Sequence, residues 1–421
     1  MIQLRIFVVL LACALLIFSK RVPLIILGVD GYAFQTYQEL GHHLDDVLFA
    51  LPLQPVFPTA SFPNFYSIST GLYPTQHGII GNVFLNKHNN ATFFFNNQQH
   101  EQFDWFRGEP IWITAKKSGL RVYTDMWIGA AADHGGVRPD YVNLFDKTKT
   151  FQEKTEDLVS NLDNEGERCD LYMVYHHEPD NTLHITEMEN KTAVKDIHNT
   201  VEEQISYLIS SLGGRQYNLI VVSDHGMVEF KERYMLSKEL ERRAKLFIGG
   251  APGMWYTRDE DGIESTVQDL NIFLSTNKIR GVAAVDVTDL PTRYKFCGLE
   301  RRGLPEIVLM VDKGVMIRNK FPSFFKSGHG YDNTLSEMRG LLRVLGPGFK
   351  NRETLRHVTS DHVTSEHVIM NTELYNLFCS LLGIKPAANT GTLNKFDFLL
   401  TNPPDRRGWE MSYTQIPEPC T

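Results

Sequence analysis

The sequence predicts an α/β fold with a mainly parallel central sheet flanked by helices and a small inserted cap. Three near-continuous apolar runs are typical of buried parallel strands, and each reaches an acidic residue at its end: 22–31, 169–180 and 217–227. Helical patterns lie between and beside these runs, at 63–70, 110–118, about 151–162 and 191–212. Strands that alternate with helices favour a parallel sheet.

Each strand-like run delivers a chemically active side chain at the carboxyl edge of the sheet, where ligands of α/β proteins collect. Asp30 ends the first run. Asp180 ends the second, and His184 follows four positions later, so both side chains can face one point. "SDHGM" places Asp224 and His225 in the turn after the third run.

Carboxylates and imidazoles that gather at one edge indicate a metal site. A sixth candidate, His329, lies between two glycines in "GHGYD", where the backbone can approach a ligand closely. Each residue alone is more often a turn or surface residue, but three Asp and three His together suit zinc. Two such ions about 4 Å apart would clamp the attacking and leaving oxygens of a phosphoryl displacement.

Ser61 in "ASFPNF" allows two interpretations. Serine is a favoured helix N-cap, Pro63 would lie in the first turn, and Gly71 would end the helix. A helix N-terminus also favours a bound phosphate, and a serine activated there would be a nucleophile. Local signals alone favour the cap.

The remaining sequence defines the expected domains. Residues 1–20 contain an apolar run that is too short to span the ~30 Å hydrocarbon core as a helix, so a secretory signal peptide is favoured over an uncleaved signal anchor. We expect a catalytic domain over 21–386, an insert at about 245–312 with its own strands and one helix, and a tail over 387–421. Beyond an N-terminal anchor, no membrane contact is predicted.

Other features agree with a secreted protein. "NAT" at Asn90 and "NKT" at Asn190 are glycosylation acceptors. Four cysteines follow the signal segment and allow up to two disulfides in three pairings: Cys169, Cys297, Cys379 and Cys420. Buried free thiols are the alternative, with Cys379 as a candidate. The formal net charge is −8 and no basic run occurs, which argues against a polymeric nucleic acid partner.

Six motifs in order resemble the nucleotide pyrophosphatase/phosphodiesterase family of the alkaline phosphatase superfamily. They are "LGVDGY", "SFPNFYSISTGLYPTQHGIIGN", "WFRGEPIWITA", "YHHEPDNTLH", "VVSDHGM" and "GHGYDN". The resemblance covers about 24–345 and implies an alkaline-phosphatase-like fold with two zinc ions. It also implies a small phosphodiester or nucleotide-like substrate.

The resemblance assigns roles to individual residues. It implies that one zinc is held by Asp180, His184 and His329, and the other by Asp30, Asp224 and His225. Ser61 stands where the family usually has a threonine nucleophile, which also touches the second zinc. Asn82 matches an asparagine that hydrogen-bonds the phosphoryl oxygen, and Phe62 matches an aromatic ring of the leaving-group pocket.

Several positions depart from the family pattern. Ala60 replaces a lysine common in nucleotide-hydrolysing members, His177 replaces the first glutamate of "EEPD", and Leu183 replaces a glycine. These changes leave the implied metal ligands intact but bear on substrate preference. Candidates for further substrate contacts are Trp127, Tyr141 and Tyr175, although buried aromatic residues are more often core.

The resulting hypothesis is a secreted two-zinc phosphodiesterase or pyrophosphatase that acts through a phosphoserine at Ser61. A phosphomonoesterase on the same fold is one alternative. A sulfatase is disfavoured, because Phe65 stands where the sulfatase signature has arginine. An extracellular binding module without turnover is the alternative from another class.

Overall fold

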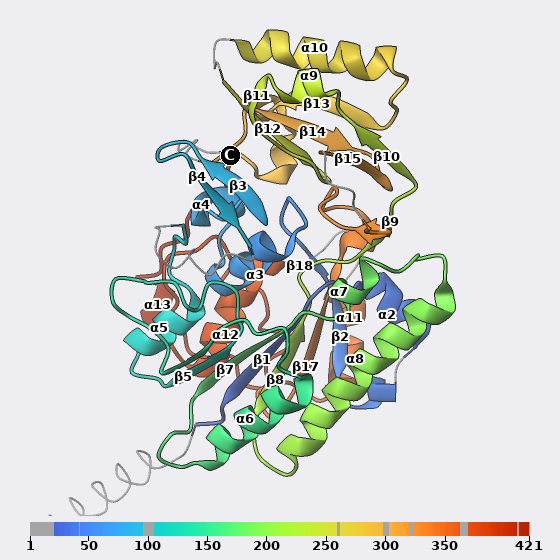
Figure 1. The fold of residues 1–421 in the computed structure, drawn as a ribbon. Coiled ribbons are helices and arrows are strands. Elements are labelled where there is room, and N and C mark those ends of the chain that lie inside the picture. Colours follow the sequence, from blue (N-terminus) through green and yellow to red (C-terminus); the bar gives the residue numbers. More distant parts are fainter. Residues whose placement is uncertain are drawn as a thin grey trace, which may run out of the picture.

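The computed structural model describes residues 21–41, 43–95, 105–258, 262–297, 303–319, 324–362, 369–410 and 412–420. The expected signal segment 1–20 lies outside these residues. The chain has the expected α/β architecture, with a large central sheet between helices and a smaller lobe above it (Figure 1). Among the described helices, none is long and apolar enough to cross a membrane.

The central sheet has eight strands and is mainly parallel. Their order is β18 (Ile369–Met370), β2 (Phe49–Gln54), β17 (Gly340–Leu345), β8 (Asn218–Val222), β1 (Leu24–Val29), β7 (Leu171–His176), β5 (Val122–Asp125) and β6 (Tyr141–Asn143). Only β17 runs antiparallel to its neighbours. The three predicted strands are therefore the adjacent central strands, and their carboxyl ends meet at one edge.

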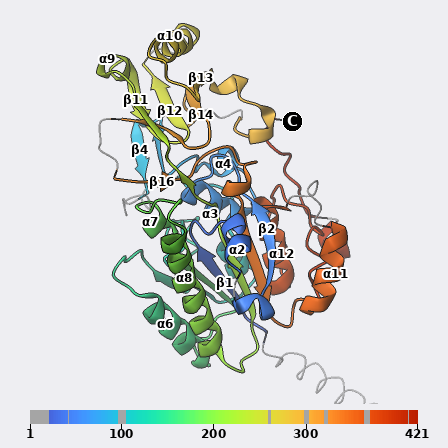
Figure 2. The same ribbon diagram turned by 90° about the vertical axis from the view of Figure 1, so that its right-hand side faces the viewer.

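Helices cover both faces of this sheet because the side chains of a strand alternate between the two faces. In β1, Leu24 and Ile26 pack with α3 (Ser61–Thr70), α5 (Ile111–Lys117) and α12 (Leu374–Leu382). Ile25 and Leu27 pack with α6 (Phe151–Asp163) and α8 (Lys191–Leu212) on the other face. Figure 2 shows α6 and α8 on one side of the sheet and α12 on the other, beside α11 (Arg352–His362).

The smaller lobe, which we call the subdomain, runs from β10 (Glu232–Met235) to β15 (Val315–Arg318). It contains an antiparallel sheet in the order β11 (Ala244–Ile248), β12 (Gly253–Thr257), β14 (Ile307–Val311) and β13 (Val282–Asp286). α9 (Lys238–Glu241) and α10 (Ile263–Thr276) cover it. Its elements extend beyond the expected limits of 245–312 because β10 and β15 pair with each other.

Short elements connect the two lobes. β3 (Val83–Asn86) and β4 (Ala91–Phe94) form a hairpin next to β11, and β9 (Val228–Glu229) pairs with β16 (Ser327–Gly328). α4 (Pro74–His77) follows α3, α7 (Asp180–Leu183) follows β7, α2 (Phe34–Leu40) follows β1, and α13 (Arg407–Glu410) lies near the end of the chain.

The C-terminal tail is tied to the rest of the chain. Cys420 forms a disulfide with Cys297, and Glu418 pairs with Lys295 at 2.8 Å. Cys169 and Cys379 are free and buried in the cores on opposite faces of the sheet. Of the two disulfides that the cysteine count allows, the described residues therefore contain one.

A short strand at the edge of the central sheet precedes α12. Ile369 pairs with Leu53 at the edge of the sheet, and α12 begins only at Leu374.

Candidate active site

Ser61 is the first residue of α3, and its side chain faces away from the helix. Ala60 is the N-cap residue and makes no side-chain capping bond. The Ser61 hydroxyl donates to Asp30 Oδ1 at 3.4 Å and lies 3.3 Å from His225 Nε2. The capping interpretation of Ser61 is therefore wrong, and its oxygen points toward the predicted metal ligands. Gly71 ends the helix in the left-handed conformation, as predicted.

The first candidate ligand group consists of Asp30, Asp224 and His225. Each offers a ligand atom, and these atoms lie within 4.8 Å of one another. All three residues are buried. The group forms because β1 and β8 are paired in register, with Gly28 opposite Val222, so both strands end at the same level.

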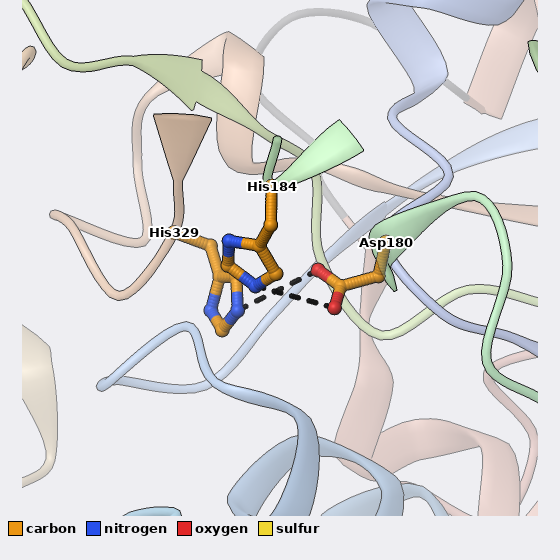
Figure 3. A group of neighbouring side chains, drawn as sticks. All are labelled: Asp180, His184 and His329. Carbon is orange, nitrogen blue, oxygen red and sulfur yellow. Dashed lines mark ion pairs between the residues drawn. The ribbon is translucent and has the colours of Figure 1, made fainter. Parts of the chain in front are cut away.

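The second group consists of Asp180, His184 and His329, and it meets the same distance limit. His184 Nε2 lies 3.3 Å from Asp180 Oδ2, and His329 Nε2 lies 3.6 Å from Asp180 Oδ1. Figure 3 shows both imidazole rings turned toward the Asp180 carboxylate. The two groups adjoin, because the His225 and His329 rings stack with centroids 3.7 Å apart. These two trios are the ones that the family resemblance implies.

All three histidines have the same orientation. Nδ1 lies 3.0 Å from Ser327 O in His184, 2.9 Å from Thr59 O in His329 and 3.0 Å from Gly226 O in His225. A carbonyl oxygen only accepts hydrogen bonds, so in each ring Nδ1 carries the proton. Nε2 then presents its lone pair to the carboxylates, which is the arrangement that second-shell contacts impose on metal-binding histidines.

The electrostatics of the first group favour binding of a cation. Burial, followed by the charges of Asp224 and Asp180, raises the pKa of Asp30 well above its ordinary value. Burial also raises the pKa of Asp224 to about 6. Since burial and like charge disfavour ionisation, a bound cation would relieve both effects.

In the second group, burial and the histidines have opposite effects on the carboxylate. Burial opposes ionisation of Asp180, but His184 and His329 outweigh it and hold the pKa of this carboxyl below its usual range. Even so, Asp180 Oδ1 and Asp224 Oδ2 are buried and accept no hydrogen bond. Buried carboxylate oxygens without donors fit metal ligands, so the donor set of both groups suits zinc.

Asn82 lies beside the start of α3. Its Oδ1 accepts a hydrogen bond from the Phe62 backbone N–H at 3.0 Å. Within the described residues, no partner engages its Nδ2, which remains available as a donor. The Phe62 ring packs edge-on against Phe93 and Phe95 at centroid distances of 5.5 and 6.3 Å.

The structure separates the other substrate-contact candidates. Tyr175 is buried and donates its hydroxyl to Asp30 Oδ2 at 2.5 Å, so it supports a candidate ligand from behind. Trp127 is a core residue, with its indole N–H on Ser69 Oγ at 2.8 Å. Tyr141 pairs with Tyr123 near the amino-terminal ends of β6 and β5, and it packs against the hydrophobic core on the opposite face of the sheet. None of these positions supports a role in the pocket wall.

Thr59 holds the backbone segment that carries His329. Thr59, which the sequence does not single out, accepts from His329 Nδ1 through its carbonyl and from the Gly330 N–H through Oγ1 at 2.8 Å. A lone threonine in a loop gives no signal for such a role.

Phe65, at the position of the sulfatase arginine, is fully buried against Trp127 and Tyr175 and so cannot contact a sulfate.

Fold and site together define an α/β protein with two adjoining carboxylate–imidazole groups, one of which contacts a helix-terminal serine. Residues 24–332 match the model of the type I phosphodiesterase/nucleotide pyrophosphatase family. The chain belongs to this family.

Similar proteins of known identity are named as phosphodiesterases or nucleotide pyrophosphatases. The chain is 30% identical over 407 residues to bovine ectonucleotide pyrophosphatase/phosphodiesterase family member 3, which covers 90% of this chain and 44% of the relative. It is 30% identical over 409 residues to a venom phosphodiesterase of Crotalus durissus collilineatus, covering 91% of this chain and 47% of the relative. The chain thus spans about half the length of these relatives.

Solved structures share the fold. Murine ectonucleotide pyrophosphatase/phosphodiesterase 5, solved as an inactive variant in complex with AMP, superposes with a TM-score of 0.77 at 23% identity. The human counterpart superposes equally well at 22% identity. Both comparisons cover 90% of this chain and 100% of the solved chain.

Proposed function

We propose that this protein is a zinc-dependent phosphodiesterase or pyrophosphatase that uses Ser61 as its nucleophile. One observation carries the proposal: three buried or partly buried imidazoles turn Nε2 toward carboxylates, and the Ser61 hydroxyl contacts both Asp30 and His225 of one of these groups. Membership of the phosphodiesterase family supports the reaction class.

The two ligand groups would each hold one zinc ion. When bound, the two ions supply Lewis-acid stabilisation of the attacking and leaving oxygens. Asp180 with its two histidines offers one carboxylate and two imidazoles, and Asp30 with Asp224 and His225 offers two carboxylates and one imidazole. These are nitrogen and oxygen donors of the kinds that zinc accepts in proteins.

The side chains around the nucleophile define the steps of the reaction. Ser61 Oγ, having released its proton to water, attacks phosphorus, and the bond from phosphorus to the leaving oxygen breaks, so that the leaving group departs as an anion and takes its proton from water. Asn82 Nδ2 donates to a non-bridging oxygen, whose charge rises in the transition state. The Phe62 N–H on Asn82 Oδ1 orients that amide. Water then hydrolyses the phosphoserine and restores Ser61.

We propose a small diester or a nucleotide-like compound as substrate. The related murine protein is described in complex with AMP. The net charge of −8 argues against a long polyanion. Ala60 beside the nucleophile supplies no cation for the second negative charge of a phosphate monoester, which favours a diester.

The activity test uses purified protein with bis-p-nitrophenyl phosphate and a dinucleotide. Ser61→Ala should lower kcat by at least about 10³-fold, because the covalent route is lost. A chelator should abolish turnover and zinc should restore it. Ser67→Ala is the matched control, since this serine of the same helix contacts His77 instead of the ligand groups.

Three results would contradict this proposal. Activity that survives both Ser61→Ala and chelation would exclude the mechanism. Faster turnover of p-nitrophenyl phosphate than of the diester would favour a phosphomonoesterase. Zinc content near zero in protein made with zinc available would favour a binding module without turnover.

We also propose that the protein is extracellular. The named relatives include an ectoenzyme and a venom protein. Asn90 is exposed in the turn of the β3–β4 hairpin. Asn190 caps α8 through Oδ1, which accepts from the Ala193 N–H at 3.2 Å, so its amide nitrogen is left for a glycan.

Peptide mapping of protein secreted from eukaryotic cells checks this localisation. The maps should contain the Cys297–Cys420 crosslink and glycans on Asn90 and Asn190. Thr92→Ala and Thr192→Ala should each remove one glycan, because the acceptor triplet is lost. Unmodified acceptors together with four free thiols would contradict secretion.

A further inference from the structure

The β3–β4 hairpin connects the subdomain to the catalytic asparagine. Asn82 directly precedes β3, and the Phe95 N–H at the end of β4 donates to the Asn82 carbonyl at 3.0 Å. The two strands therefore hold the Asn82 backbone from both sides. The register of the hairpin, Val83 opposite Phe94, determines where that backbone lies.

A buried charge pair fixes the hairpin against the subdomain. Glu306, next to β14, pairs with Lys87 at the end of β3 and is only 6% exposed. Its other oxygen accepts the Thr257 N–H of β12 at 2.9 Å. Both carboxylate oxygens are thus committed, one to each element, so the pair fixes the relative position of β3 and the subdomain sheet.

A second contact reaches the same loop directly. Gly81 precedes Asn82, and a Cβ added there would lie 3.2 Å from Met254 Cε of β12 and 3.1 Å from Val83 O. The loop is therefore packed closely against the subdomain, with little space for another side chain. Lys245 also donates to Asn90 Oδ1 at the exposed tip of the hairpin, at 2.6 Å.

Loss of the Glu306 charge would act at a distance through these contacts. Lys87 would keep its charge in a partly buried setting without a carboxylate, so the hairpin would be free to shift. The shift would move the Asn82 backbone and with it the amide that Phe62 orients. A displacement of about 1 Å from a mutation far from the chemistry can cost about 100-fold in rate.

We propose that Glu306 is a positioning residue for catalysis, which acts through Lys87 and the hairpin on Asn82. This inference rests on the proposed function of Asn82 as a donor to the phosphoryl group. On this inference, the subdomain contributes to transition-state stabilisation, although neither the candidate metal ligands nor the nucleophile belong to the subdomain.

The experiment is a double-mutant cycle in the full-length zinc-loaded protein, with Glu306→Gln, Asn82→Ala and the double variant. Glu306→Gln should lower kcat for bis-p-nitrophenyl phosphate by about 10-fold, with KM and zinc content little changed. In the Asn82→Ala background, Glu306→Gln should have no further effect on kcat, because the group it positions is gone. A general structural defect would instead add in both backgrounds.

Matched variants separate positioning from loss of charge. Asp269→Asn removes an exposed charge pair with Arg243 within the subdomain and should leave kcat at the wild-type value. If Glu306→Gln does not fold, Lys87→Gln combined with Glu306→Gln replaces it, since neither side chain of the pair then carries a charge. This double variant should lower kcat only when Asn82 is present, as Glu306→Gln does.

The outcomes for this inference and for the proposed function differ. Equal kcat values for wild type and Glu306→Gln, or equal losses with and without Asn82, would overturn the positioning role while the enzyme remains active. Absence of zinc-dependent diesterase activity in the wild-type protein would overturn the proposed function itself.

Discussion

Tyr175 shows what a single hydroxyl group decides in the candidate site. It donates to Asp30 Oδ2, while Ser61 contacts Oδ1 of the same carboxylate. Burial and the Asp30 charge raise the pKa of Tyr175, so its hydroxyl stays protonated and can donate to an ionised Asp30. Such a contact orients a ligand and tunes its charge.

Tyr175→Phe should therefore weaken zinc binding by about 10- to 100-fold, because Asp30 loses its orienting donor. Titration against a competing chelator measures the change. Tyr172→Phe is the control, since Tyr172 lies on the same strand but donates its hydroxyl to Asn161 on the opposite face. Equal zinc affinity in Tyr175→Phe and wild type would show that Asp30 needs no such support.

Individual residue types carried different amounts of information in the sequence. Asp30, Asp180 and Asp224 end apolar runs, and this pattern placed them at one edge before any contact was known. Trp127, Tyr141 and Tyr175 carried no comparable signal, because an aromatic residue serves a core and a pocket equally well. Only packing decides which of the two it joins.

At the level of elements, apolar pattern predicted the strands that are buried on both faces. β1, β7 and β8 lie within the predicted runs, and α3, α5, α6 and α8 begin and end within two residues of the predicted helices. β17 is different because it contains Arg343, which is fully buried and pairs with Glu202 of α8 at 2.6 Å. An apolar pattern cannot predict a strand whose charge is matched only in three dimensions.

The hairpin and the subdomain show the same limit. Their strands are only four or five residues long, so the sequence predicts strands within the insert but not how they pair, and it does not predict the hairpin. The Lys87–Glu306 pair joins residues far apart in the chain, and neither has a local partner that would mark it. The inferred positioning of Asn82 therefore depends wholly on tertiary contacts.

At the level of the whole molecule, metal binding and folding stability are coupled. Burial raises the pKa of Asp224 in the folded metal-free protein from the ordinary value of 3.8 to about 6. Between these values the folded state holds a proton that the unfolded chain has released. Stability of the metal-free protein therefore falls as pH rises through this window, and the loss persists above it.

Asp224→Asn should remove this loss of stability, because asparagine does not ionise. In zinc-free protein, we expect the variant to be more stable than wild type at pH 7 by about 2–3 kcal/mol, with the difference vanishing below about pH 4. Denaturant unfolding at several pH values measures it. With excess zinc the order should reverse, because only the wild type has the full ligand set. A pH-independent difference would contradict a titrating Asp224.

The sequence by itself predicted the fold class, the edge of the sheet where chemistry gathers and the six candidate ligands, whereas their division into two sets came from the family resemblance. It could do so because strand ends and local motifs are properties of short segments. Tertiary structure alone decided that Ser61 faces Asp30 instead of capping its helix, that Tyr175 supports a ligand, and that Cys297 pairs with Cys420. These outcomes depend on which distant segments pack together, and packing is a property of the whole chain that no local pattern specifies.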